Sequence, residues 1–234
     1  MVSPKPQLSR REFAPPVAGE AMHPRRHGCV RGAVLLALLL AYGARLSKTT
    51  LATGLNRLVG LGYAVPGAVI AVGVLIPVTR LDNWLAGQWE QWFGSNPGLL
   101  LTGGIAAMIY AYLVRFLAVA LHTVEASLAR ITPNMDDAAR SLGLGQGATL
   151  RRVHAPMRRG SLVTAGLLVF VDVMKELPAT LVMRPFNFDT LATQAYTLAS
   201  DERLAEASTA SLAIVAVGLL PLIALSRQVS RARK

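Results

Sequence analysis

The sequence predicts an all-α protein whose helices cross a membrane several times, and three observations predict this class. Of the 234 residues, 53% are hydrophobic and 16% are charged, with a mean hydropathy of +0.43, which is more apolar than an ordinary soluble domain. The apolar residues fall in long blocks, and a membrane-spanning helix requires a block of about 20 residues. Basic residues lie between the blocks, as they do in the loops of inner-membrane proteins.

The charge and the scarcity of metal-binding residues argue against other classes. The net charge of +11 suits nucleic acid in principle, but the arginines do not follow one polar face with interleaved aromatic residues. We therefore expect no nucleic-acid partner. Cys29 is the single cysteine, which excludes an intrachain disulfide or a cysteine-held iron–sulfur cluster. Among the four histidines only His23 and His27 have ligand spacing, and Pro24 lies between them, so we expect no resident metal.

Five apolar blocks are candidate spans, at about residues 33–45, 59–79, 99–121, 160–182 and 206–225. The first block is short for a span and also fits the core of a signal peptide, with Ala44 as a cleavage residue. We interpret it as a shortened span. The second block contains glycines and prolines that would break a soluble helix, but a membrane bundle tolerates them.

Two polar segments flank this membrane domain, which covers residues 33–227. Residues 1–32 carry no helical or strand period and are interpreted as a disordered basic tail, and residues 228–234 as a basic cytoplasmic tail. Five spans with a cytoplasmic C-terminus leave the first tail outside the cell, where basic residues are disfavoured. One interpretation is that the chain begins within what is normally a longer protein, with a foreign or mis-started N-terminus.

The loops fall into two sets that differ in basic residues. The loop after the first block, the loop 122–159 and the C-terminal tail carry Arg45, Lys48, Arg57, Arg130, Arg140, Arg151, Arg152, Arg158, Arg159, Arg227, Arg231, Arg233 and Lys234. The opposite loops, 81–98 and 183–205, carry only Arg184 and Arg203. Basic loops favour the cytoplasmic side. The sequence therefore predicts a multi-pass inner-membrane protein with its C-terminus in the cytoplasm.

The loop 122–159 contains a spaced motif: Asp137-Ala138-Ala139, three residues, Gly143, nine residues, then Val153-His154-Ala155-Pro156. The motif resembles the EAA signature of binding-protein-dependent ABC permeases, which reads Glu-Ala-Ala, three residues, Gly, nine residues, then Ile, any residue, Leu and Pro. The spacing is complete, and the departures are Asp137 for Glu, Val153 for Ile and Ala155 for Leu. The resemblance implies a helical hairpin that docks as a coupling helix in a groove of the ATP-hydrolysing subunit. The alternative is a solvated basic hairpin.

The residue types in the motif suit such a hairpin. Asp136 and Asp137 can lie near a helix N-terminus and complement its dipole, and Gly143 can end or bend that helix. Ala138 and Ala139 would form a small-residue face that a partner can approach closely. Arg151 and Arg152 are expected on a second helix, which Pro156 breaks before the next span, and His154 is expected at the surface. The predicted docking residues are Asp136, Asp137, Ala138, Ala139, Gly143, Val153 and Pro156.

The fourth block carries charges that a span rarely contains. Asp172, Lys175 and Glu176 lie in its middle and Pro178 follows. Asp172 and Glu176 share a helix face at spacing i,i+4, and Lys175 can pair with Asp172 at spacing i,i+3. Either the charges form a local ion pair that locks helix packing, or a carboxylate lines a cation path. These four residues form the candidate translocation path, whereas Arg115 in the third block is expected to extend to the cytoplasmic interface.

Three segments resemble the ferric-iron permeases: residues 172–208, 62–69 and 111–121. Together with the EAA-type motif, the resemblance covers about residues 33–227. It implies a bundle of the type found in the methionine and maltose importers, with a short helix on the outer face at about residues 184–204. Ferric-iron permeases are usually a fusion of two such halves, and this chain resembles only the C-terminal half.

The resemblance implies the membrane-spanning permease of an ABC importer that translocates ferric iron as cargo. The chain has no GxxxxGK[ST] phosphate-binding loop, so ATP is expected on a separate subunit and no cofactor on this chain. Expected partners are a cytoplasmic ABC ATPase dimer, a periplasmic substrate-binding protein, the lipid bilayer, and a second permease copy or the missing half. Alternatives are another cargo (thiamine, polyamine, phosphonate, sulfate or molybdate) or a truncated, non-transporting fragment. No catalytic constellation is apparent, so we do not expect an enzyme.

Overall fold

The computed structural model describes residues 24–47, 49–185 and 188–232, and this part of the chain is all-α, as predicted. Its elements are α1 (Pro24–Ser47), α2 (Thr50–Gly60), η1 (Leu61–Tyr63), α3 (Gly67–Phe93), α4 (Ile105–Leu128), α5 (Pro133–Ser141), α6 (Gln146–Thr149), η2 (Leu150–His154), α7 (Ala155–Met157), α8 (Arg159–Lys175), α9 (Pro178–Met183), α10 (Leu191–Ser200) and α11 (Leu204–Ala232). Of the two short elements named η, η1 is a 3-10 turn and η2 is a π-helical turn.

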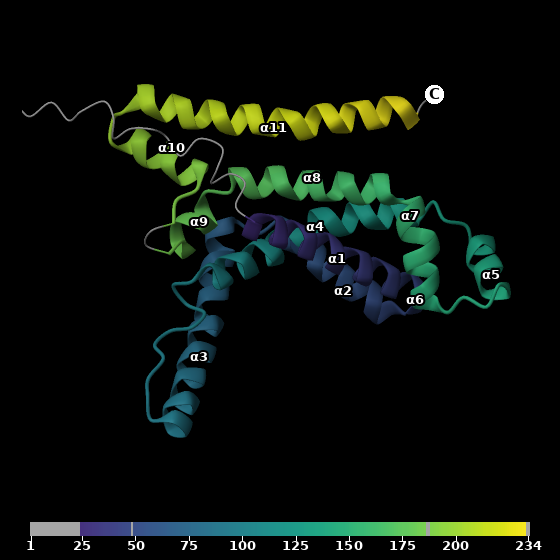
Figure 1. The fold of residues 1–234 in the computed structure, drawn as a ribbon, viewed down its shortest axis with the longest axis horizontal. Helices are drawn as coiled ribbons and strands as arrows, with labels where there is room; N and C mark the ends of the chain where they lie inside the picture. The colour runs from purple at the N-terminus through teal and green to yellow at the C-terminus, as the bar shows by residue number, and fades with distance from the viewer. Residues whose placement is uncertain (1–23, 48, 186–187, 233–234) are drawn as a thin grey trace, which may run out of the picture.

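Helices α1, α4 and α8 lie side by side and form the core of a bundle (Figure 1). Ala33, Ala37 and Ala41 of α1 are almost fully buried. Their i,i+4 spacing places them in one stripe, and such small side chains let helix backbones approach closely. The larger buried side chains of this core include Phe116 and Leu121 of α4. Helix α2 packs on α1 and α4, and α11 lies along α8.

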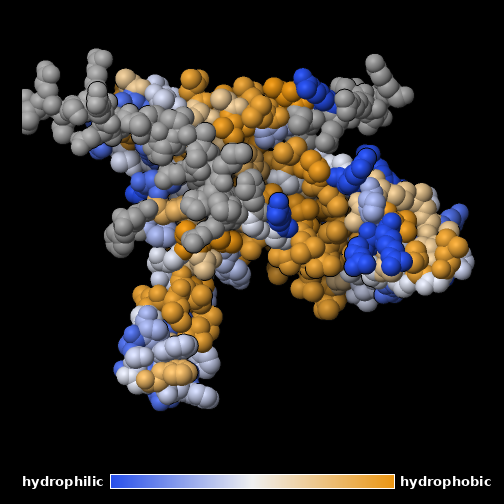
Figure 2. All heavy atoms as spheres, in the orientation of Figure 1, coloured by the Kyte–Doolittle hydropathy of each residue, from blue (hydrophilic) through white to orange (hydrophobic). Residues whose placement is uncertain are grey.

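Four helices in the described part of the chain are long and apolar enough to cross a membrane: Gly28–Ser47 within α1, α3, α4, and Leu204–Ile223 within α11. Each leaves more than half of its most apolar stretch uncovered by the rest of the chain. Apolar side chains lie along the flank of the bundle, whereas hydrophilic ones gather at the end formed by α5, α6 and α7 (Figure 2). The prediction of an all-α, polytopic membrane helix bundle is confirmed.

The observed helix boundaries differ from the predicted spans at both ends of the chain. Helix α1 begins at Pro24, so residues 24–32 are helical and the first span is not short. Proline suits the first turn of a helix because its φ is already helical and its missing N–H would have no partner there. The rest of the predicted N-terminal tail, residues 1–23, lies outside the described residues. Helix α11 continues to Ala232, through most of the predicted C-terminal tail.

Prolines split the second and fourth predicted spans. The block 59–79 contains the end of α2, the turn η1 and the start of α3, with Pro66 in an extended conformation before Gly67. The block 160–182 contains α8 and α9, which are separated because Glu176 is extended (φ −70°, ψ 114°). Pro178 has no N–H for the carbonyl four residues earlier and its ring clashes with that carbonyl. The third block is shifted, since α4 starts at Ile105 and runs to Leu128.

Helix α3 projects away from the bundle, and the chain returns to α4 through residues 94–104 (Figure 1). Asp82 of α3 is fully buried and holds this return segment. Its carboxylate accepts hydrogen bonds from the backbone N–H groups of Leu100, Leu101 and Thr102, at 2.7 to 3.1 Å. A charged side chain in an apolar helix is thus satisfied by backbone donors.

The two ends of the bundle carry different elements. Helices α5, α6 and α7 lie at the end where α1 and α11 finish, and α9 and α10 lie at the opposite end (Figure 1). Helix α10 begins with a capping box in which Thr190 and Thr193 satisfy each other's backbone N–H groups. It falls inside the segment 184–204, where the resemblance implies a short helix.

Candidate functional site

Residues 133–157, hereafter the hairpin, form the first candidate site. Helix α5 begins at Pro133, in the first-turn position that proline favours. It ends where Gly143 adopts φ +79°, with hydrogen bonds from the Gly143 N–H to the Arg140 carbonyl (2.9 Å) and from the Leu144 N–H to the Ala139 carbonyl (3.0 Å). This pair of bonds is the Schellman arrangement, which needs a left-handed residue. The prediction that Gly143 ends the first helix is confirmed.

The second half of the hairpin is a nearly continuous helical run. Helix α6, the turn η2 and helix α7 follow one another from Gln146 to Met157. Arg151 and Arg152 lie in η2, as the sequence predicted for a second helix. The prediction that Pro156 breaks this helix is wrong. The run passes through Pro156 and ends at Met157, and Arg158 (φ −106°, ψ 15°) separates it from α8.

The predicted docking residues are not all on the surface. Asp137, Ala138, Gly143 and Pro156 are exposed, Val153 is half-buried and Ala139 is buried. Asp137 pairs on the surface with Arg140, one helical turn later. The side chain of Leu142, which the sequence reading did not single out, is 81% exposed. The exposed residues of the hairpin therefore include a carboxylate, small residues and apolar side chains.

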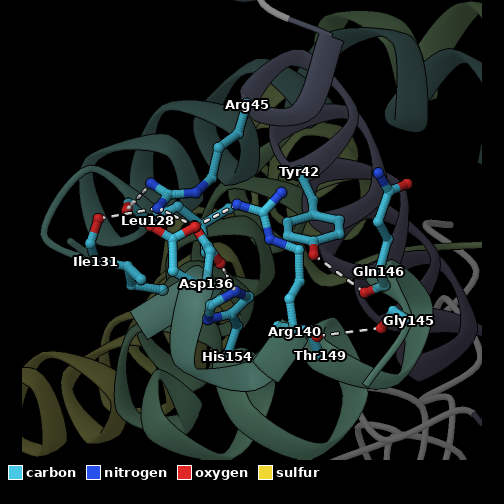
Figure 3. Close-up of polar contacts among 11 residues, drawn as sticks. Tyr42, Arg45, Leu128, Ile131, Asp136, Arg140, Gly145, Gln146, Thr149 and His154 are labelled. Atoms are coloured by element: carbon cyan, nitrogen blue, oxygen red, sulfur yellow. Dashed lines mark hydrogen bonds and ion pairs between the residues drawn. The ribbon is translucent and has the colours of Figure 1, made fainter. Parts of the chain in front are cut away.

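Asp136 turns inward and joins three segments of the chain (Figure 3). Its Oδ2 accepts a hydrogen bond from Nη2 of Arg45 at 2.7 Å, and its Oδ1 contacts Nε2 of His154 at 2.7 Å. Arg45 also donates to the carbonyls of Leu128 and Ile131, both at 3.0 Å. Burial opposes ionisation of Asp136, but the hydrogen bonds from Arg45 and His154 outweigh it and lower the pKa of this carboxyl.

This contact bears on two expectations. The docking role of Asp136 stays a prediction, and both of its oxygens are used within the chain. His154 was expected at the surface, but it is fully buried beside the ring of Tyr42, with the ring centroids 5.6 Å apart. The sequence carried no signal for the Arg45 contact, because Arg45 lies 91 residues before Asp136. The spacing of residues within the hairpin does not predict which other helix packs against it.

A cavity of about 600 Å³ lies between the hairpin and the end of α1. Its wall includes Arg45, Asp136, Arg140, Gln146 and Thr149. The hydroxyl of Tyr42 crosses to the hairpin and donates to the Gln146 carbonyl at 3.0 Å (Figure 3). The hairpin is therefore held to α1 at separate points, with polar space between them.

The second candidate site contains the charges of the fourth predicted span. Lys175 pairs with Asp172 at 2.8 Å, as the i,i+3 spacing predicted. Glu176 does not share a helix face with Asp172, because α8 ends at Lys175. Its Oε2 lies 3.3 Å from Nε of Arg115, and its Oε1 accepts from the Ala179 N–H at 3.1 Å. Each carboxylate of this cluster thus has a cationic partner.

Arg115 was expected to extend to the membrane interface, and this expectation is wrong. Its side chain is only 18% exposed, and its Nη1 donates to the Val65 carbonyl at 3.0 Å. Gly67, the first residue of α3, lies against the same ion pair. A Cβ at that position would stand 2.3 Å from Oε1 of Glu176 and 2.8 Å from Nη1 of Arg115. The pair therefore ties α4 to both helix breaks, and only a glycine leaves room for it.

No resident-metal site accompanies these two clusters. Among the described residues, no group of three or more His, Cys, Asp or Glu side chains lies close enough to hold a metal ion. The contacts described at the hairpin and at the charge cluster are packing contacts, hydrogen bonds and ion pairs.

Comparison with known proteins identifies relatives among transport permeases. No model of a known protein family matches the chain. It is 28% identical over 194 residues to the Fe(3+)-transport system permease protein FbpB 2 of Haemophilus influenzae, which covers 83% of this chain and 35% of that protein. It is 26% identical over 193 residues to the putative 2-aminoethylphosphonate transport system permease protein PhnV of Salmonella typhimurium, which covers 82% of this chain and 65% of that protein. The PhnV protein of Salmonella paratyphi A matches with the same coverage.

The chain thus spans about a third of the iron permease and slightly less than two thirds of the phosphonate permeases. This partial coverage agrees with the predicted resemblance to one part of a longer permease. The two kinds of relative are named for different cargoes, a metal cation and a phosphonate. The resemblance of this chain to the permeases of ABC importers, first suggested by the spaced motif of the hairpin, is therefore confirmed.

Proposed function

We propose that the chain is a transmembrane permease subunit of an ABC importer of the inner membrane, driven by a separate ATPase. The observation that carries this proposal is the exposed hairpin face, where Asp137, Ala138 and Gly143 stand at the spacing of the EAA signature. Leu142 adds an apolar side chain that is 81% exposed beside this motif. The hairpin lies at the bundle end that carries the basic loops, which is the cytoplasmic side under the positive-inside preference.

In this proposal each element has a partner. The hairpin docks on one subunit of a cytoplasmic ATPase dimer, and the opposite end, with α10, faces a periplasmic substrate-binding protein. A second permease copy or the missing half completes the bundle, which agrees with the large uncovered surfaces of α3 and α11. The carboxylates Asp172 and Glu176, with Lys175 and the helix break at Pro178, remain the candidate translocation path.

We assign ferric iron as the cargo, on the likeness to the iron permease and on the similarity of the segments 62–69, 111–121 and 172–208 to ferric-iron permeases. A phosphonate is the second candidate, on the likeness to the phosphonate permeases. Asp172 and Glu176 are each neutralised by a cation, Lys175 and Arg115, so the cluster carries no excess negative charge for a metal cation. The charge cluster therefore does not separate a metal cation from a phosphonate.

The test is uptake in cells that lack their own iron and phosphonate permeases. The cells express this chain with its binding protein and ATPase, and uptake of radiolabelled ferric iron and of 2-aminoethylphosphonate is measured side by side. ATP-dependent uptake of iron alone supports the first assignment, and uptake of the phosphonate alone overturns it in favour of the second.

A parallel measurement separates a transporter from a fragment that only binds the ATPase. The ATPase is isolated through a tag on this chain from detergent-solubilised membranes. Co-purification without uptake of either cargo supports a non-transporting fragment or one that needs its missing half. Absence of both uptake and co-purification, with the chain present in the membrane, contradicts the proposed function.

A further inference from the structure

The hairpin is fastened to the bundle by side chains that the EAA-type motif does not include. Arg45, two residues before the end of α1 at Ser47, donates to Asp136 and to two carbonyls at and just after the end of α4, those of Leu128 and Ile131. Asp136 contacts His154 on its other oxygen. One guanidinium and one carboxylate therefore join α1, the end of α4, and both halves of the hairpin.

The burial of these groups makes the connection specific. His154 is fully buried, and its Nδ1 has no hydrogen-bond partner in the described part of the chain. The contact between Nε2 and Asp136 is therefore the polar contact that orients the imidazole, whose ring also packs beside Tyr42. The side chains of Arg45 and Asp136 are 22% and 27% exposed, and hydrogen bonds between charged, partly buried groups of this kind are strong.

Outside this connection, the first helix of the hairpin has little to hold it. The surface of α5 is mostly exposed, with Ala139 as its buried residue. The exposed Asp137 pairs only along the surface with Arg140. The cavity between α1 and the hairpin leaves space into which α5 could tilt. The connection through Asp136 is therefore what sets the angle of α5 against the bundle.

We propose that Arg45 is a positioning residue that, through Asp136 and His154, fixes the hairpin to the end of α1 so that the two move as one body. This inference rests on the proposed function in one respect, because a moving ATPase is what would displace the hairpin. Force on the exposed face of α5 then passes through Asp136 into α1 and the end of α4. Both helices pack in the bundle core, so the displacement reaches the transmembrane helices.

The chain is well suited to a direct test, because Cys29 is its single cysteine. In a Cys29→Ala background, cysteines are introduced at Leu39 on α1 and Leu142 on the hairpin, which are 51% and 81% exposed. Spin labels at the two sites report their distance distribution by pulsed electron paramagnetic resonance. The full chain is measured in lipid nanodiscs, without ATPase, so this readout does not depend on the proposed function.

The test compares Arg45→Gln with Arg57→Gln, which removes the same charge from an exposed residue of α2 that makes no side-chain contact in the argument above. We expect Arg45→Gln and Asp136→Asn to broaden the distance distribution at least twofold, and Arg57→Gln to leave it unchanged. The double variant of Arg45 and Asp136 should be no broader than either single variant, since both remove the same connection. An unchanged distribution in Arg45→Gln overturns the proposal.

A second readout applies once the chain is assembled with its ATPase. In Arg45→Gln, ATP hydrolysis and co-purification of the ATPase should persist, while cargo uptake per ATP falls about tenfold, and Arg45→Lys should restore part of it. Normal uptake per ATP in Arg45→Gln contradicts the coupling role even if the hairpin loosens. Failure of the ATPase to bind the unmodified chain contradicts the proposed function instead, and the distance measurement still decides whether Arg45 positions the hairpin.

Discussion

Substitution of Gly62 by alanine tests a close backbone contact between η1 and α4. Gly62 lies in the turn η1, and a Cβ placed there would stand 2.4 Å from the backbone carbonyl oxygen of Val114 in α4. Real Cβ atoms essentially never approach another atom within 3.0 Å, so the two backbones must separate by at least about 0.6 Å. Neither partner is the end of a flexible side chain, and overpacking of this kind costs about 1–3 kcal/mol. We expect Gly62→Ala to lower the free energy of unfolding by that amount.

The matched control is Gly54→Ala in α2, where a Cβ meets nothing within 4 Å. There the greater helix propensity of alanine should raise stability by about 0.5–1 kcal/mol. Both variants are unfolded with increasing mole fraction of sodium dodecyl sulfate in mixed micelles, and the transition is followed by circular dichroism. Equal midpoints for Gly62→Ala and Gly54→Ala would refute the close approach of η1 to α4.

Three further outcomes are expected from the two candidate sites. Gly143→Val forces a β-branched residue into φ +79°, which costs about 1–2 kcal/mol. This variant should weaken co-purification of the ATPase without reducing membrane insertion. Full retention of the ATPase would argue against docking at this hairpin. Glu176→Gln leaves Arg115 buried without its counter-ion and should lower the free energy of unfolding by about 3 kcal/mol. Adding Arg115→Met to this variant should recover most of the lost stability. Additive losses for the two substitutions, measured by unfolding in sodium dodecyl sulfate, would contradict the pairing. Asp136→Asn should lower the melting temperature by an amount that is constant between about pH 5 and 7. That difference should shrink below about pH 4. The pKa of Asp136 is held below the ordinary 3.8 in the folded chain, so the stability that its charge gives is lost as the pH falls through the folded-state pKa. A difference in melting temperature that grows on acidification would refute the lowered pKa.

The features that the sequence predicted correctly depend on local chemistry. The helix end at Gly143 needs only a left-handed residue and two backbone hydrogen bonds. The pair of Lys175 with Asp172 needs only one helical turn. The apolar blocks predict membrane helices because the bilayer, not the rest of the chain, sets their length.

The errors in helix boundaries had local signals that apolar periodicity does not weigh. Pro24 marks a helix start in the first-turn position that proline favours. Pro66 and Pro178 each lack the N–H that a continuous helix requires, and helices stop before both of them. Hydropathy alone averages over these residues and therefore places one long span where the structure has two elements.

The contacts that define both sites could not be predicted from a single sequence. Arg45 and Asp136 are 91 residues apart. Arg115 lies in α4, whereas Glu176 lies in the break between α8 and α9. A lone arginine near an apolar block fits snorkelling as well as burial, because its alkyl chain is apolar and its head is charged. Whether an arginine has a carboxylate nearby depends on how α1, α4 and the break between α8 and α9 are arranged in the fold.

The most direct test of the central claim, that the hairpin docks an ATPase, is site-specific photocrosslinking in assembled membranes. A photoreactive amino acid replaces Ala138 on the exposed face of α5, and in a matched variant it replaces Tyr196, which is 50% exposed on α10 at the opposite end of the bundle. We predict that the chain labelled at Ala138 crosslinks to the ATPase and that the chain labelled at Tyr196 does not. Crosslinking to the ATPase from Tyr196, or from neither position while the complex co-purifies, would contradict the proposed docking.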